Sequence, residues 1–152
     1  MLKEKITVGE AVSLINESIL NFEDGLPTET ISKLIYSINN EIQIRDYLLG
    51  LPNTFPLETC RSFISYVGAS VDESESYSIF TVLSAYFFEL DEMELSALSI
   101  ATALNIKPDY SLALLLKRVY EAGWSAKAFV QMRDELHEKV VEHLEEIQDN
   151  LI

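Results

Sequence analysis

The chain has 152 residues, and its 25 acidic and 11 basic side chains give a formal net charge of −14 at pH 7. A surface this acidic repels the phosphates of nucleic acids and of anionic membranes, because binding them requires clustered Lys and Arg. The hydrophobic fraction of 48% far exceeds that of a disordered chain and is sufficient for the core of one folded domain.

The first half of the chain predicts four helical elements. The low counts of Gly (5) and Pro (4) favour long helices over a turn-rich β-sandwich or barrel. A first helix begins at Thr7, which fits a capping box with Glu10. Thr28 caps a second helix, and Pro56 suits the first turn of a fourth. The third element, at residues 42–49, is short, and a brief strand is the alternative there. Breaks between elements lie at residues 24–27, 39–40, 50–53 and 72–75.

Three more helices are predicted before residue 123. The fifth covers residues 79–87, and the sixth begins after Asp91 and Glu92 and stops at Pro108. The seventh ends at Gly123, a typical left-handed cap. It carries apolar side chains on several sides, so we expect it to lie at the centre of the fold. Those side chains are Leu112, Leu114, Leu115, Leu116 and Val119.

Ser125 opens a last, amphipathic helix at residues 125–152. Its apolar side chains recur every three or four residues, as in a coiled-coil seam. They are Phe129, Met132, Leu136, Val140, Leu144, Ile147 and Leu151. We expect this stripe to pack on the body; the alternatives are a projecting helix that forms a homodimer or binds a partner helix. Residues 1–152 are then one all-α domain, a compact bundle of seven or eight helices.

Residues 80–108 have the spacing of two antiparallel helices that approach closely through small side chains. Large, small and aromatic residues alternate at Phe80, Leu83, Ser84, Phe87, Ser96, Ile100, Ala103 and Pro108. This pattern resembles one tetratricopeptide repeat, which implies a helical hairpin used for scaffolding or binding. Ser84, Ser96 and Ala103 would let the two backbones touch. The pattern does not continue, because Lys117 and Arg118 stand where large apolar and small residues are required.

A broader resemblance covers residues 31–124. It is carried by residues 44–49, 97–103 and 108–115 together with Gly123. These segments resemble the C-terminal helical half of the actinobacterial family called domain of unknown function 4192. That family favours an Asp before the proline and a Gly-rich corner, where this chain has Lys107 and residues 89–92. The resemblance implies a helical fold and no particular activity.

The sequence contains no phosphate-binding loop, dinucleotide fingerprint, nucleophile elbow or zinc-binding cysteine set. His137 and His143 are six residues apart, so they point to different faces of a helix. Cys60, the only cysteine, has no histidine near it in the sequence. Arg45 and Asp46 are better interpreted as a structural pair than as a functional one. We therefore expect a protein that is not an enzyme and holds no cofactor or metal.

The function that these observations favour is a protein–protein interaction or scaffold module. Trp124, at a helix junction, is either a wedge that locks the last helix to the hairpin or an anchor for a partner, since Trp is enriched in binding hot spots. The acidic face of the last helix presents carboxylates that suit a basic partner. The predicted partner-binding residues are Trp124, Glu138, Glu142 and Glu145.

A second hypothesis starts from the net charge of −14. It is an acidic inhibitor, of phage origin, that imitates DNA and occupies a basic nucleic-acid-binding protein. This hypothesis requires carboxylates in two rows near the spacing of duplex phosphates. Neither hypothesis involves direct binding of nucleic acid or membrane. A secretory signal and a span of ~20 apolar residues are both missing from the sequence, so we expect a cytoplasmic location.

Overall fold

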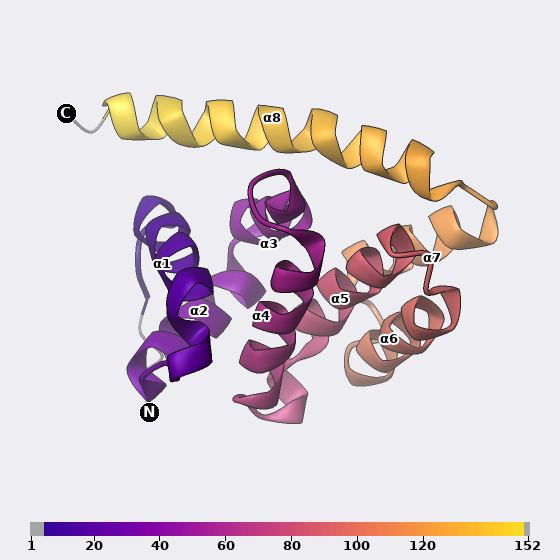
Figure 1. Cartoon of the computed structure of the whole chain (residues 1–152), viewed down its shortest axis with the longest axis horizontal. Coiled ribbons are helices and arrows are strands. Elements are labelled where there is room, and N and C mark those ends of the chain that lie inside the picture. Colours follow the sequence, from indigo (N-terminus) through magenta and orange to yellow (C-terminus); the bar gives the residue numbers. More distant parts are fainter. Residues whose placement is uncertain (1–4, 151–152) are drawn as a thin grey trace.

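Eight α-helices and three short 3₁₀ turns make up most of residues 5–150, the part of the chain that this computed structural model describes (Figure 1). The helices are α1 (Val8–Asn21), α2 (Thr28–Asn40), α3 (Ile42–Leu49), α4 (Leu57–Ala69), α5 (Tyr77–Glu89), α6 (Met93–Ile106), α7 (Ser111–Glu121) and α8 (Ala126–Asn150). No strand occurs within residues 5–150, and the segment at 42–49 is helical. The prediction of an all-α bundle of seven or eight helices is confirmed.

The ends of the helices follow local sequence signals. The Thr7 hydroxyl accepts a hydrogen bond from the Glu10 amide and the Thr7 amide donates to the Glu10 carboxylate, both at 3.1 Å, so the predicted capping box is present. Two boundaries are shifted by one residue. Pro27 rather than Thr28 flanks the start of α2, and Pro56 precedes α4 instead of lying in its first turn. Both prolines have an extended backbone, which no residue inside a helix can adopt.

The central helix is α5, which lies between two clusters of buried apolar side chains. Ile79 and Tyr86 belong to the first cluster, which α1 to α5 form together. Ala85 and Phe88 belong to the second, which α6, α7 and the start of α8 complete. α5 can be covered on both sides because its only charged residue is its last one, Glu89.

The prediction that the seventh helix is central is wrong. α7 buries Leu112, Leu116 and Val119, but Leu114 and Leu115 are exposed to solvent. Apolar residues occur on two sides of α7 because one side of the helix packs on the second core cluster and another side lines a groove that is open to solvent. Periodicity alone does not distinguish these two surroundings.

The α5–α6 hairpin is held together through small side chains, as predicted. Ser84, Ser96 and Ala103 are all buried. The two serines hydrogen-bond reciprocally, each hydroxyl donating to the backbone carbonyl of the other at 2.8 Å. Asp91 adopts a left-handed conformation (φ 61°) in the turn between the helices, where the Glu92 amide donates to the Phe87 carbonyl and closes α5. The likeness to a tetratricopeptide repeat stays a prediction.

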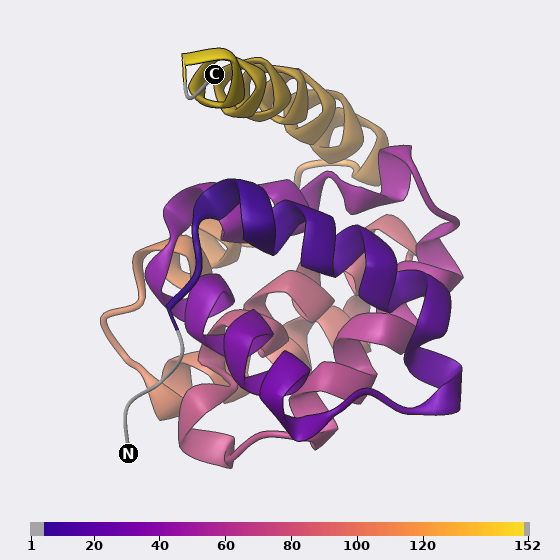
Figure 2. The same ribbon diagram turned by 90° about the vertical axis from the view of Figure 1, so that its left-hand side faces the viewer.

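The last helix, α8, runs back over the body from the α7 end toward α1 (Figure 1). Seen from the α1 side, it forms a layer of its own above the other helices (Figure 2). It contacts α5, α3 and α1 in turn. Side chains are described for its residues up to 143, so the predicted positions Leu144, Glu145 and Ile147 lie outside them, as does Leu151. Within residues 5–150, no helix combines the length and apolar content that a membrane span requires.

The inward face of α8 differs from the predicted stripe. Phe129 is buried as expected, and Met132 and Val140 are partly buried against the two core clusters, but Leu136 is 49% exposed. Two polar residues are buried instead: Arg133, four residues after Phe129, and His137, four residues after Arg133. Residues 129, 133 and 137 span only about 80° round an α-helix, so this spacing of four also keeps them on one face. The body supplies partners for these two polar side chains.

Candidate protein-binding groove

Arg133 joins α8 to the core through a buried ion pair. Its guanidinium donates to both carboxylate oxygens of Glu89, at 2.8 and 2.7 Å, and both side chains are buried. It also donates to Asn53 and to its neighbour Asp134. Burial raises the pKa of Glu89 against the opposing effect of Arg133. Burial acts to lower the pKa of Arg133, but the hydrogen bond and charge of Glu89, together with the charge of Asp134, make the net shift upward. This bidentate pair fixes α8 at one position along the body.

One turn further on, His137 packs against the end of α3. Its ring lies 5.4 Å from the ring of Tyr47. A Cβ built on Gly50 would lie only 2.0 Å from the Nδ1 atom of His137, so glycine is required for this approach. Nδ1 is buried and makes no hydrogen bond within the described residues. Burial lowers the pKa of His137, and the nearby Arg133 acts in the same direction.

Stability should therefore depend on pH through His137. The folded protein holds this side chain neutral, so its contribution is present above the unfolded pKa of about 6.5 and is lost as the pH falls below it. The groups facing it are Tyr47, Arg133 and Asp134. We expect His137→Gln to remove a slope of up to about 1.4 kcal/mol per pH unit from urea unfolding between pH 7 and 5. His143→Gln, at an exposed position, should keep the wild-type slope. Equal slopes in wild type and His137→Gln would contradict this assignment.

Cys60 lies near the same ion pair, inside the core. It is buried, and its Sγ is 3.7 Å from the Phe55 carbonyl oxygen. Burial raises the pKa of its thiol to about 12, and the charge of Glu89 adds to this effect. The thiol is therefore neutral at pH 7, whereas a nucleophilic cysteine is a thiolate. These surroundings are those of a core residue.

An apolar groove of about 290 Å³ opens between α3, α7 and α8, beside Trp124. We call it the Trp124 groove. Its inner part is formed by buried side chains, Leu116, Val119 and Phe129. Large apolar side chains that solvent reaches surround its opening: Leu115 is 53% exposed, Trp124 41% and Leu136 49%. Exposed apolar side chains gathered round one concavity are typical of a binding surface.

Arg45 and Asp46 line the α3 side of this groove. Arg45 donates to one oxygen of Asp46 from Nε and Nη2, at 3.2 and 3.1 Å. Its guanidinium also lies 5.9 Å from the centre of the Tyr110 ring. The charge of Arg45 is thus balanced and held in place, which agrees with the interpretation of this pair as structural while placing it at the edge of the groove.

Of the predicted partner-binding residues whose side chains the structure describes, Trp124 lines the groove and Glu138 and Glu142 do not. Trp124 lines the groove, and its side chain is 41% exposed to solvent. Glu138 and Glu142 are exposed on α8 but do not line the groove. Glu138 follows Leu136 by two residues, or about 200° round the helix. Sequence reasoning missed Leu115 and Leu136 as groove residues, because each matched a buried apolar pattern.

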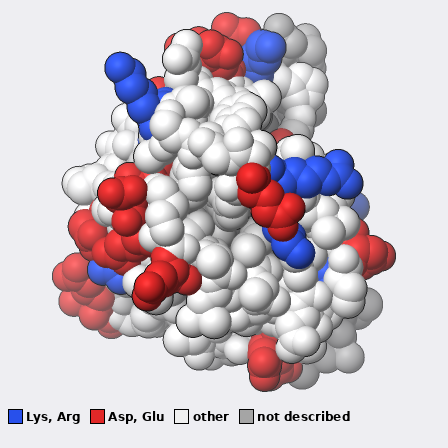
Figure 3. Space-filling view, turned by 90° about the vertical axis from the view of Figure 1, so that its right-hand side faces the viewer, with Lys and Arg blue, Asp and Glu red and all other residues white. Residues whose placement is uncertain are grey.

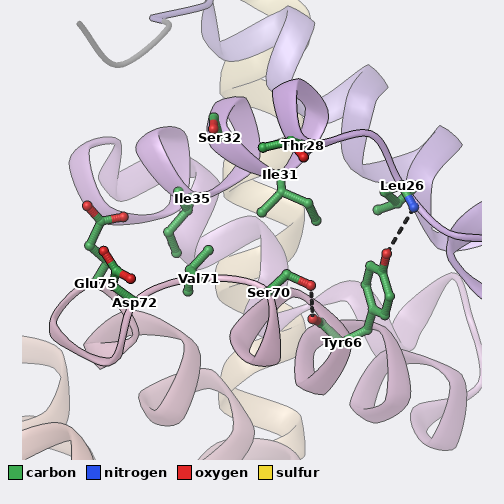
Figure 4. A pocket seen from close by; sticks show the side chains of 10 residues that line it. All are labelled: Leu26, Thr28, Ile31, Ser32, Ile35, Tyr66, Ser70, Val71, Asp72 and Glu75. Atoms are coloured by element: carbon green, nitrogen blue, oxygen red, sulfur yellow. Dashed lines mark hydrogen bonds between the residues drawn. The ribbon is translucent and has the colours of Figure 1, made fainter. Parts of the chain in front are cut away.

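A second cavity, of about 330 Å³, lies between α2, α4 and the segment before α5 (Figure 4). At one end Tyr66 accepts a hydrogen bond from the Leu26 amide at 2.9 Å. Asp72 and Glu75 lie at the other end (Figure 4). The Ser70 hydroxyl donates to the Tyr66 carbonyl at 2.8 Å, and neither His nor Lys is among the residues that line this cavity. Among the described residues, no group of three or more His, Cys, Asp or Glu could hold a metal ion.

No family model, curated protein or solved structure matches this chain. The resemblance to domain of unknown function 4192 therefore stays a prediction, and the case for function depends on the geometry of this molecule.

Proposed function

We propose that the protein is a non-enzymatic interaction module that binds an amphipathic helix of a partner protein in the Trp124 groove. The observation that carries this proposal is the arrangement of Leu115, Trp124 and Leu136, three exposed apolar side chains round one groove with an apolar interior. A helix that lays its apolar face into such a groove buries these side chains together with its own anchors. Trp at the edge of a groove is the residue type most enriched in binding hot spots.

The charge of the chain favours a partner helix that is basic on its other face. The net charge of −14 attracts cationic segments over distances beyond direct contact and speeds their association. On the face shown in Figure 3, acidic side chains stand in separate small groups rather than in two rows. A DNA mimic requires rows of carboxylates that match the phosphates of the duplex. Separate acidic groups favour instead a partner helix that has apolar anchors and basic residues around them. The proposal thus keeps the basic partner of the first hypothesis.

A synthetic peptide can test the groove directly. The probe is a 14-residue helix former with Leu at positions i, i+3, i+4 and i+7 and Lys on the opposite face; a scrambled peptide of equal composition is the control for charge alone. Trp124 is the only tryptophan, so its fluorescence reports on the groove itself. We expect the amphipathic peptide to shift the Trp124 emission to the blue, and the scrambled peptide to leave it unchanged.

Variants distinguish the contribution of direct contacts in the groove from that of long-range attraction between the acidic protein and the basic peptide. Trp124→Ala should weaken binding of the labelled peptide about 30-fold, as for a hot spot worth about 2 kcal/mol. Leu20→Ala on α1, where the leucine is 74% exposed, is the matched control and should leave the Kd unchanged. Glu138→Lys with Glu142→Lys should slow association at low salt and leave dissociation unaltered. Equal Kd values for wild type and Trp124→Ala would refute the proposed function.

A further inference from the structure

α8 is attached to the body by few apolar side chains. Within its residues 126–143, Phe129 is the only apolar side chain that is fully buried, whereas α4 and α7 each bury four. The other two buried residues, Arg133 and His137, are ionisable. In Figure 2, α8 forms the outermost layer, with no described helix above it. A helix that buries little apolar surface can leave its place while the rest of the domain stays folded.

While α8 is in place, a proton on His137 finds no acceptor at Nδ1. This atom is buried and has no hydrogen-bond partner among the described residues. The Tyr47 ring lies 5.4 Å from the imidazole, but its hydroxyl donates to Asn16 on α1 at 2.9 Å. An imidazolium donates from both ring nitrogens, so the protonated ring would bury a charged donor without a partner, which is costly. Water reaches Nδ1 only after α8 has moved away.

The charges around His137 also oppose a positive charge on its ring. Burial lowers the pKa of His137 and the Arg133 guanidinium lowers it further, whereas the smaller effect of Asp134 raises it. Asp134 and, from α5, Glu89 both accept hydrogen bonds from Arg133. Among the described residues, no charged side chain of α1 or α3 shifts the pKa of His137, and the Tyr47 hydroxyl, whose pKa burial raises, is neutral. Docking of α8 and protonation of His137 therefore compete.

α8 also forms one side of the Trp124 groove. Phe129, Met132 and Leu136 line the groove from this helix. Leu136 directly precedes His137 in the chain, so both side chains leave the body when this part of α8 does. Release of α8 thus removes one side of the groove and exposes Trp124 further.

We propose that α8 is a pH-sensitive switch: a proton on His137 releases α8 from the body and takes apart the Trp124 groove. A histidine in water has a pKa of about 6.5. Each pH unit below that value therefore favours the released state by up to about tenfold, which amounts to at most about 30-fold at pH 5. The link to partner binding rests on the proposed function, whereas the release of α8 can be measured without a ligand.

Hydrogen exchange of the full chain, followed by mass spectrometry without a ligand, tests the release. Tertiary packing supplies most of the stability of a protein helix, so the amides of a detached α8 exchange. At pH 7 we expect the amides of residues 133–143 to be less protected than those of α4 and α5. Between pH 7 and 5 their protection, corrected for the intrinsic exchange rates, should fall by up to about 30-fold.

Variants assign this fall to one side chain. His137→Gln and His137→Leu cannot titrate, so each should keep the protection of residues 133–143 constant within about twofold over the same pH range. Two variants are used because either one can shift the protection itself, and only its change with pH is compared. His143→Gln, at an exposed position of the same helix, is the matched control and should show the wild-type fall. Circular dichroism of each variant establishes that it is folded.

The amphipathic peptide tests the link between α8 and the groove. It binds only the state with an intact groove, so at ten times its Kd it should raise the protection of residues 133–143 at pH 5 about tenfold. The scrambled peptide should have no effect. If the amphipathic peptide has none either, the proposed function is contradicted, while a fall in protection measured without peptide still supports the release of α8.

Three results without peptide would overturn the proposal. The first is a protection of residues 133–143 that is equal at pH 7 and pH 5. The second is a fall that both His137→Gln and His137→Leu retain. The third is exchange of α8 at the same free energy of opening as α4 and α5, which would mean that α8 opens only when the whole fold does.

Discussion

Glu89→Ala should lower the free energy of unfolding by about 3–5 kcal/mol, because it leaves the Arg133 guanidinium charged and buried without its bidentate partner. Neither Asn53 nor Asp134, the other groups to which Arg133 donates, restores the two parallel bonds that the Glu89 carboxylate accepts. Urea unfolding followed by circular dichroism measures the loss. Since Arg133 joins α8 to α5, Trp124 fluorescence should report the change in the same transition.

Two comparisons make this prediction specific. Glu58→Ala breaks an exposed ion pair with Arg61 on α4 and should cost at most about 1 kcal/mol. The double variant Glu89→Leu with Arg133→Met removes both buried charges and should be close to wild type or more stable, as buried pairs often are when apolar side chains of similar volume replace them. If Glu89→Ala cost no more than Glu58→Ala, the buried pair would not hold α8 in place.

Gly50→Ala should destabilise the protein by about 3 kcal/mol or more, the upper end for overpacking. Its added Cβ would lie 2.0 Å from Nδ1 and 2.5 Å from Cβ of His137. Because the His137 Cβ is attached to the backbone of α8, rotation of the ring cannot relieve the second contact, and the helix itself has to move. This displacement would also strain the ion pair of Arg133 one turn earlier. Urea unfolding measures the effect.

A double-mutant cycle identifies His137 as the cause. His137→Gly removes the three atoms nearest to the new methyl, so Gly50→Ala should cost about 1–3 kcal/mol less in that background. Gly9→Ala is the control for the substitution as such. A Cβ at Gly9 in α1 meets nothing within 4 Å, so this variant should gain about 0.5–1 kcal/mol from helix propensity. Additive effects of Gly50→Ala and His137→Gly would mean that the close approach does not exist.

Features that depend on neighbours in the sequence could be predicted. The capping box of Thr7 and Glu10 is set by residues three apart. Gly123 ends α7 with a positive φ of 77°, and the Ser125 hydroxyl accepts a hydrogen bond from the Ala128 amide at the start of α8. The close contact of α5 with α6 was also predictable, because a short turn forces two adjacent helices together and small residues such as Ser84 mark the contact.

Burial of polar side chains and the position of the groove depended on residues far apart in the chain. Arg133 is buried because Glu89, 44 positions earlier, offers a carboxylate at that point of the body. His137 is buried because Gly50 leaves space for its ring. The spacing of apolar residues in α8 contains no information about Glu89 or Gly50. The predicted stripe therefore placed Leu136 on the buried face of the helix.

The sequence by itself determined most of the helices, the approximate positions of their ends and the hairpin, since hydrogen bonding and steric fit within a few residues decide these features. Only the tertiary structure decided that α5 is central, that Trp124 shares a groove with Leu115 and Leu136, and that Glu138 does not line it. An apolar side chain has the same spacing whether it faces a core or an open groove. The difference depends on which distant helix covers it.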